Sequence, residues 1–201
     1  MKTDVILVGG FHEMIELCED CGLNIVGIID NNLIGNYCGY PVVGKDCDAE
    51  VLFTEYGKAK IIVTPDPPNL RKKLVEYYKS IGYSFIKVIS PQAKVSRYAK
   101  IGNGTVIQSG VNVSSSTIIG SFCKLNTNCN IMHDNIVGDY ATIAPNAVSL
   151  GGVRVGESSY IGANCTILPG MAIGNNSVVG AGSVVTHNIA NGKTVKGVPA
   201  K

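Results

Sequence analysis

The second half of the chain places an aliphatic residue at every sixth position. The series continues from Val95 almost to the end of the chain, and Ser149 is its single exception. Its members are Val95, Ile101, Ile107, Val113, Ile119, Leu125, Ile131, Val137, Ile143, Ser149, Val155, Ile161, Ile167, Ile173, Val179 and Val185. A period of six fits neither the 3.6-residue helical repeat nor the alternation of a simple strand. It is typical of a solenoid of short parallel strands.

A second register, four residues after each aliphatic position, holds mostly small residues. These are Ala99, Thr105, Val111, Thr117, Cys123, Cys129, Ala141, Ala147, Val153, Ser159, Cys165, Ser177 and Ser183. One large and one small inward residue per hexad would fill a narrow prism at the density of a protein interior. Gly and Asn stand between the two registers, as in Ile101-Gly102-Asn103-Gly104, and suit tight turns. We therefore expect each hexad to form one flat face.

Residues 95–201 resemble the left-handed parallel β-helix of hexapeptide-repeat acyltransferases. The resemblance includes the closing segment Lys196-Gly197-Val198-Pro199-Ala200. It implies that three hexads make one triangular coil, so that residues eighteen apart stack on one another. The left-handedness is also implied by the resemblance, because crossovers between parallel strands are usually right-handed.

Residues 1–89 lack the hexad rhythm and alternate short apolar runs with amphipathic stretches. We expect strands over residues 4–8, 24–30, 59–64 and 84–89, and helices over residues 11–21, 49–56 and 69–81. Alternating strands and helices favour βαβ units around a parallel sheet. The predicted organisation is a small Rossmann-like domain over residues 1–89, followed by a β-helix domain over residues 90–201.

The first strand is followed by Gly9-Gly10-Phe11-His12-Glu13. Phe11 and Glu13 occupy positions where the G-x-G-x-x-G fingerprint needs small residues, which disfavours NAD. Glycines between a strand and a helix N-terminus still offer N–H groups to a phosphate. Asp30 and Asn31, which end the second strand, suit hydrogen bonds to a ribose or a base. The alternative is a plain tight turn with Asp30 as a cap.

The whole chain resembles the two-domain sugar acyltransferases that modify bacterial nucleotide-linked amino sugars or sialic acid. In that family the first domain binds a nucleotide-sugar through a Gly-Gly-His-type loop and an acidic pair. The resemblance implies substrate-binding roles for Gly10, Phe11, His12, Asp30 and Asn31, with Phe11 where a glycine or serine is usual. The proline-rich segment 65–68 departs from the family pattern and implies a different substrate preference.

His133 is the strongest candidate catalytic residue among the three histidines of the chain. Because Ile131 points inward, His133 lies at the edge of its face and points outward. Acyl transfer from a thioester needs a base near neutral pKa, which histidine supplies. The adjacent Asp134 can fix the imidazole tautomer, and the resemblance places a catalytic histidine followed by an acidic residue here. The alternative is a solvated His-Asp pair in a turn.

Counting eighteen residues from His133 places Gly151 beside it, one coil later. Backbone N–H groups of the Gly151-Gly152 pair could stabilise negative charge on an acetyl carbonyl, and the exceptional Ser149 lies in the same coil. The resemblance implies further contacts: Asn126 near the acceptor, Thr142 in place of a second histidine that contacts acetyl-CoA, and coenzyme A running along Gly151, Ala163 and Ala181.

Composition narrows the choice of partners. The chain has a net charge of +2 and no blocks of like charge. It therefore lacks the basic patch that would bind nucleic acid or an anionic membrane. The absence of eighteen consecutive apolar residues disfavours membrane insertion, and we expect a cytoplasmic protein.

The seven cysteines are scattered along the chain, which fits reduced thiols better than a set of disulfides. Cys123, Cys129 and Cys165 fall in the small inward register and are expected to fill the core as compact apolar residues. The histidines do not supply the three metal ligands that a hexapeptide carbonic anhydrase needs, so no metal is expected.

The sequence thus predicts an acetyl-CoA-dependent N-acetyltransferase of a nucleotide-linked amino sugar. His133 would be the general base and Asp134 its orienting partner, and the resemblance also implies a homotrimer. Two alternatives stay open: O-acetylation of sialic acid or another sugar hydroxyl, and a non-catalytic nucleotide-sugar-binding or structural β-helix protein.

Overall fold

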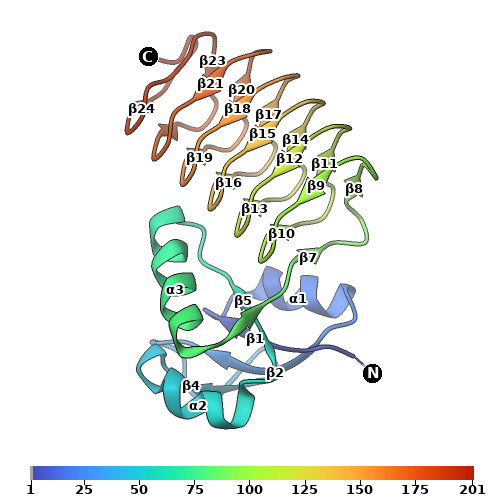
Figure 1. Ribbon diagram of the computed structural model, residues 1–201, viewed down its shortest axis with the longest axis vertical. Helices are drawn as coiled ribbons and strands as arrows, with labels where there is room; N and C mark the ends of the chain where they lie inside the picture. The colour runs from blue at the N-terminus through green and yellow to red at the C-terminus, as the bar shows by residue number, and fades with distance from the viewer. Residues whose placement is uncertain (1) are drawn as a thin grey trace.

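The computed structural model describes residues 2–201 as an α/β unit followed by a triangular prism of coils (Figure 1). The α/β unit holds one sheet with the strand order β3-β4-β2-β1-β5-β6. Its strands are β1 (Asp4–Val8), β2 (Asn24–Ile29), β3 (Asn36–Tyr37), β4 (Tyr40–Gly44), β5 (Lys60–Val63) and β6 (Ser84–Phe85). Its helices are α1 (His12–Asp20), α2 (Ala49–Tyr56) and α3 (Pro68–Ile81), with a short 3₁₀ turn, η1 (Asp46–Asp48). These elements confirm the predicted Rossmann-like architecture.

The sheet is parallel except for the small hairpin of β3 and β4. That hairpin and the pairing of β4 with β2 are absent from the prediction, because β4 contains Pro41 and its residues are half-buried without alternation. The strand order reverses at β1, which pairs with β2 on one side and with β5 on the other. Open α/β sheets bind ligands at the carboxyl ends of the strands that flank such a reversal.

The prism consists of two-residue strands that form three parallel sheets. The first prism sheet contains β7 (Val88–Ile89), β10 (Val106–Ile107), β13 (Lys124–Leu125), β16 (Thr142–Ile143), β19 (Tyr160–Ile161), β22 (Val178–Val179) and β24 (Thr194–Val195). The second contains β8 (Lys94–Val95), β11 (Asn112–Val113), β14 (Asn130–Ile131), β17 (Val148–Ser149), β20 (Thr166–Ile167) and β23 (Val184–Val185). The third contains β9 (Lys100–Ile101), β12 (Ile118–Ile119), β15 (Ile136–Val137), β18 (Arg154–Val155) and β21 (Ala172–Ile173).

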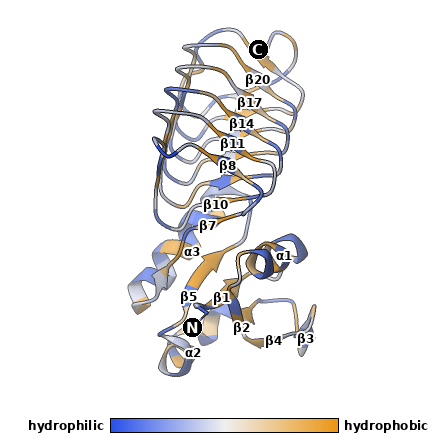
Figure 2. Ribbon diagram, turned by 90° about the vertical axis from the view of Figure 1, so that its right-hand side faces the viewer, coloured by the Kyte–Doolittle hydropathy of each residue, from blue (hydrophilic) through white to orange (hydrophobic). Residues whose placement is uncertain are grey.

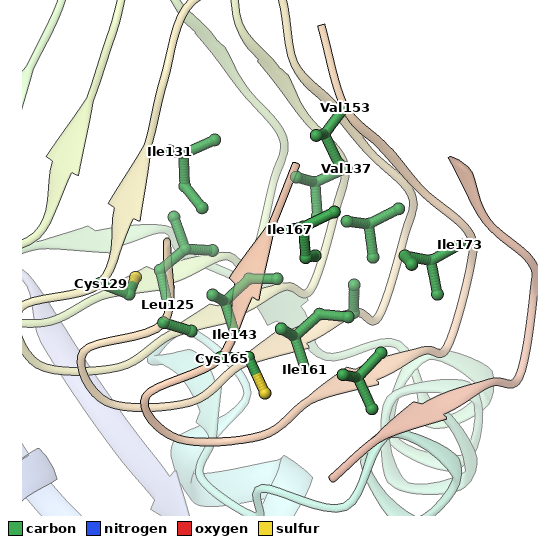
Figure 3. Packing of buried hydrophobic residues seen from close by; sticks show 14 of the residues in the cluster. Leu125, Cys129, Ile131, Val137, Ile143, Val153, Ile161, Cys165, Ile167 and Ile173 are labelled. Atoms are coloured by element: carbon green, nitrogen blue, oxygen red, sulfur yellow. The ribbon is translucent and has the colours of Figure 1, made fainter. Parts of the chain in front are cut away.

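Both predicted inward registers point into the prism. Paired strands lie eighteen residues apart, as in Lys124 opposite Thr142, except for β22 and β24, which are sixteen apart. The aliphatic side chains of successive coils therefore stack in columns (Figure 3). Cys123, Cys129 and Cys165 are buried in the same core. Both apolar and polar stretches occur along the coils (Figure 2). The hexad pattern therefore predicted the β-helix and its core correctly, and the left-handedness is the one that the resemblance implied.

From Gly104 to Gly182, the corners of the prism place one residue each in the left-handed backbone region. Gly104, Gly110, Asn128, Asn146 and Asn164 occupy such positions, with φ between 57° and 69°. Gly pays no steric penalty there and Asn tolerates the conformation well. The Gly and Asn residues between the two registers thus form the predicted turns.

Arg71 of α3 joins the α/β unit to the prism. Its buried guanidinium donates hydrogen bonds to the carbonyl oxygens of Phe122, Tyr140 and Ala141 in the prism, and to those of Pro65 and Asp66 in the loop after β5. Burial lowers the pKa of Arg71 to about 10. The charge is balanced by aligned carbonyl dipoles, so the first prism sheet is held against α3.

The segment 84–89 is divided at this junction. β6 joins the α/β sheet by pairing with β5, whereas β7 pairs with β10 and opens the first coil. One continuous strand was expected here, but the chain bends between Phe85 and Val88 to pass from one core to the other. No helix among residues 2–201 is long and apolar enough to span a membrane.

Candidate active site

His133 lies at the corner between β14 and β15 and is largely exposed, with 64% of its side chain accessible. Its Nδ1 lies 2.8 Å from Oδ2 of Asp134. Asp134 has a left-handed backbone, with φ of 60°, because it occupies the corner position of its hexad. When Nδ1–H donates to this carboxylate, the lone pair of the imidazole is on Nε2, which can then accept a proton.

Gly151 lies directly beside the imidazole, as the count of eighteen predicted. A Cβ atom at Gly151 would lie 2.7 Å from Nε2 of His133, so only glycine leaves room for the ring. The neighbouring Gly152 donates its N–H to the carbonyl of His133 at 3.0 Å. Within residues 2–201 the N–H of Gly151 makes no hydrogen bond, which leaves a backbone donor next to the imidazole.

The loop after β1 is organised by Asp30. Its Oδ2 accepts the N–H of Gly10 at 2.9 Å, and its Oδ1 accepts the N–H groups of Asn32 and Leu33. Desolvation raises the pKa of Asp30, but the three hydrogen bonds outweigh it and the net pKa lies below its ordinary value. The capping role weighed for Asp30 is therefore present in the structure.

The other two polar candidates of this region are also engaged within the chain. Asn31 exchanges two hydrogen bonds with Asp46 of η1. His12 opens α1, and its Nδ1 lies 2.7 Å from the hydroxyl of Tyr37, against which the ring packs edge to face. Both side chains are exposed and brace the loops that follow β1 and β2.

A hollow of about 260 Å³ opens where the strand order reverses, between the loops after β1 and β5. Gly9, Gly10 and Phe11 line one side and Thr64, Pro65 and Asp66 the other. Lys124 of the prism forms its floor. The Lys124 ammonium is buried, donates to the carbonyl of Thr64 at 2.7 Å and lies 2.8 Å from Oδ1 of Asp66 and 5.3 Å from the centre of the Phe11 ring.

Lys124 was not predicted as a site residue. It occupies an outward strand position, where a lysine is ordinarily solvated, and only the packing of the α/β unit against the first prism sheet buries it. Burial lowers the pKa of its ammonium, although Asp66 opposes this. No periodicity in the sequence distinguishes it from a surface lysine.

The remaining candidates lie at two different edges of the prism. Asn126, Ala163 and Ala181 occupy the corner between the first and second prism sheets, which we call the Asn126 edge. His133 and Gly151 occupy the next corner, between the second and third sheets, which we call the His133 edge. One face of the prism separates the two groups within a single chain.

The structure corrects the prediction that Thr142 contacts acetyl-CoA. Its side chain is fully buried beneath α3, where Oγ1 donates to the carbonyl of Asp66 and accepts a hydrogen bond from Arg71. The hydroxyl is committed to the junction between the α/β unit and the prism. Within residues 2–201 no three or more His, Cys, Asp or Glu side chains gather in a way that could hold a metal ion.

The fold and the exposed histidine at a prism corner define a hexapeptide-repeat acyltransferase. Residues 152–187 match the family model described as the hexapeptide repeat of succinyl-transferase. The comparison with curated protein sequences gives no significant match.

Solved structures match the chain over almost its full length. GDP-perosamine N-acetyltransferase from Caulobacter crescentus, in complex with CoA and GDP-perosamine, is 31% identical with a TM-score of 0.94, covering 98% of this chain and 95% of that one. The acetyltransferase domain of PglB from Neisseria gonorrhoeae, in complex with acetyl coenzyme A, is 26% identical with a TM-score of 0.92, covering 100% and 99%. WeeI from Acinetobacter baumannii, 24% identical with a TM-score of 0.86 over 100% and 99%, shares the fold. The chain belongs to the hexapeptide-repeat sugar acyltransferase family.

Proposed function

We propose that this protein transfers the acetyl group of acetyl-CoA to the amino group of a nucleotide-linked amino sugar, with His133 as the general base. The observation that carries the proposal is the arrangement at the His133 edge. An exposed imidazole has its Nδ1 held by Asp134, and its Nε2 lies over a glycine whose N–H is unpaired within residues 2–201.

Each group at this edge has a part in the transfer. Nε2 of His133 removes a proton from the sugar amine as the nitrogen attacks the thioester carbonyl carbon. Asp134 stabilises the imidazolium that results, and the N–H of Gly151 donates to the carbonyl oxygen as negative charge develops there. The C–S bond then breaks, the imidazolium returns the proton to the leaving thiolate, and the products are an N-acetylated sugar and the thiol of CoA.

The α/β domain of residues 1–89 is proposed as the nucleotide-sugar clamp. Gly10, Phe11 and His12 follow β1, and Gly10 and Phe11 border the hollow at the strand reversal, where ligands of open α/β sheets bind. The N–H groups that open α1 suit a phosphate. Asp30 and Asn31 support the clamp by fixing its loops. The N-acetyltransferase that matches at 31% identity is bound to a GDP-linked sugar and to CoA, which supports the same two substrates here.

A complete site is proposed to need a second copy of the chain. The Asn126 edge carries Asn126 for the acceptor and the small residues Ala163 and Ala181 for the pantetheine of CoA, but it lies one face away from His133. Packing the His133 edge of one chain against the Asn126 edge of another would bring the groups together. Ile118 and Ile136, neighbours on the third prism sheet, are 44% and 40% exposed and would be covered in this assembly. Three copies close the ring, which gives a homotrimer.

The substrate is tested by measuring release of CoA thiol from acetyl-CoA with a panel of acceptors. We expect turnover with UDP-, GDP- or TDP-linked amino sugars. Sialic acids and nucleotide sugars that carry a hydroxyl in place of the amine form the comparison arm. Turnover with the hydroxyl acceptors alone would replace the proposed N-acetylation by O-acetylation.

A further inference from the structure

The turn that carries His133 is fastened from inside the prism by Asn135. This residue stands in the small inward register and is fully buried. In other coils a polar side chain of this register donates one hydrogen bond to the carbonyl fifteen residues later. These bonds join Thr105 to Gly120, Thr117 to Met132, Ser159 to Gly174 and Cys165 to Gly180. Asn135 makes the same bond to the carbonyl of Leu150, at 2.8 Å.

Asn135 does more than the hydroxyls and thiols of the other coils. Its carboxamide carries a second hydrogen, and Nδ2 also donates to the carbonyls of Met132 at 2.9 Å and His133 at 3.2 Å. The side chain therefore ties the turn of His133 to the coil that contains Gly151. A residue with a single donor hydrogen could not serve both the coil and the turn.

Ser149 completes this arrangement. The carboxamide oxygen of Asn135 lies in an apolar interior, where an acceptor without a donor is costly. Ser149 is 2% exposed, and its Oγ donates to Oδ1 of Asn135 at 2.5 Å. An aliphatic residue at this position could not donate. Ser149, the single exception in the aliphatic register, is thus the hydrogen-bond partner of Asn135, the one carboxamide in the small register.

We propose that Asn135 and Ser149 are positioning residues for the acyl transfer. They hold the turn so that the imidazole of His133 stays over Gly151 with Nδ1 on Asp134. Both side chains are closed to solvent and cannot touch a substrate, so they act only through His133. This inference rests on the proposed function, in which His133 is the base.

Asn135→Thr is the informative variant, because threonine keeps the bond to Leu150 and gives up the bonds to Met132 and His133. We expect kcat to fall by about tenfold or more with little change in KM, since misplacing a catalytic group by an ångström is costly. Ser149→Ala, which removes the donor to Asn135, should act in the same direction. Ser159→Ala removes the corresponding bond to the carbonyl of Gly174 elsewhere in the prism, together with the bond that its Oγ accepts from the N–H of Ser177. This control should lower the melting temperature as much as Asn135→Thr while leaving kcat unchanged.

A second experiment distinguishes positioning of His133 from a general effect on stability. The Asn135→Thr substitution is repeated in a His133→Ala background. Positioning predicts no further loss of the residual rate there, and equal losses in both backgrounds would overturn the proposal. An unchanged kcat of Asn135→Thr in the otherwise native chain would also overturn it. A His133→Ala variant as fast as the native enzyme would instead refute the proposed function. Imidazole ¹⁵N NMR gives a second readout: Asn135→Thr should reduce the Nδ1-protonated tautomer of His133, and an unaltered His133 signal contradicts the proposal.

Discussion

The imidazole of His133 lies so close over Gly151 that a Cβ atom there would be 2.6 Å from its Cε1. Real Cβ contacts are not that short, so any side chain at Gly151 must displace the ring. We predict that Gly151→Ala lowers kcat by about ten- to a hundredfold, because the base leaves its reacting position. Steady-state kinetics with acetyl-CoA and the best acceptor measure this. Gly192→Ala, at a prism glycine away from His133 with open space at its Cβ position, controls for the loss of a glycine in the coils, and equal kinetic losses in both variants would contradict the prediction.

Asp134 should matter through the tautomer of His133. Replacing it by Asn removes the charge that stabilises the imidazolium and allows the ring to adopt the wrong tautomer. We predict a loss of about 10²-fold or more in kcat/KM for Asp134→Asn, smaller than that for His133→Ala. Asp134→Glu, which keeps the charge on a longer side chain, should retain more activity than Asp134→Asn. The reverse order for the Glu and Asn variants would argue against an orienting carboxylate.

Arg71 should be a major determinant of stability at the junction. Arg71→Met would leave the carbonyl oxygens of Phe122 and Tyr140 without their donors inside a buried interface. We predict a loss of about 2–6 kcal/mol in the free energy of unfolding, because each of the two buried carbonyls left without a donor costs about 1–3 kcal/mol. Urea denaturation measures it. The matched control is Lys72→Met. Lys72 also lies on α3, and the substitution removes its solvent-accessible ion pair with Glu157 of the prism. It should lower the free energy of unfolding much less. Similar losses of unfolding free energy in the two variants would refute a special role of Arg71 in the stability of the junction.

Asp30 should make stability depend on acid pH. Its pKa in the folded chain lies below the ordinary value of 3.8. Its contribution is therefore fully present above 3.8 and is lost as the pH falls through the lower folded pKa. We predict that Asp30→Asn is less stable than the native chain at neutral pH, and that the difference shrinks below pH 3.8. Denaturant midpoints across this range provide the measurement. Asp20→Asn, whose carboxylate accepts no hydrogen bond within residues 2–201, should show no such trend, and a difference for Asp30→Asn that stays constant with pH would contradict the prediction.

The sequence predicted the parts of the molecule that follow from a repeated pattern. The hexad register defined the prism core, and the count of eighteen placed Gly151 beside His133 because the coils around His133 have eighteen residues each. The alternation of apolar and amphipathic stretches gave the main strands and helices of the α/β unit. Local periodicity suffices where each residue meets neighbours at a fixed spacing.

The sequence did not predict features that depend on packing in three dimensions, either between the α/β unit and the prism or inside the prism. The family resemblance matches Thr142 to a ligand-contacting position, but α3 covers this residue and Arg71 donates a hydrogen bond to its hydroxyl. Lys124 resembles a surface lysine until the loop after β5 encloses it. Ser149 was recognised as an exception, but its reason lies in Asn135, whose carboxamide needs a partner that only the three-dimensional arrangement identifies.

The role of His133 as the general base is tested by the rate of CoA thiol release by His133→Ala, measured with acetyl-CoA and the nucleotide-linked amino sugar that the native enzyme turns over best. Removal of a general base predicts a fall in kcat of about 10²–10⁴-fold, with a melting temperature close to that of the native chain because the side chain is exposed. A His133→Ala enzyme that releases thiol at the native rate would show that His133 is not the general base.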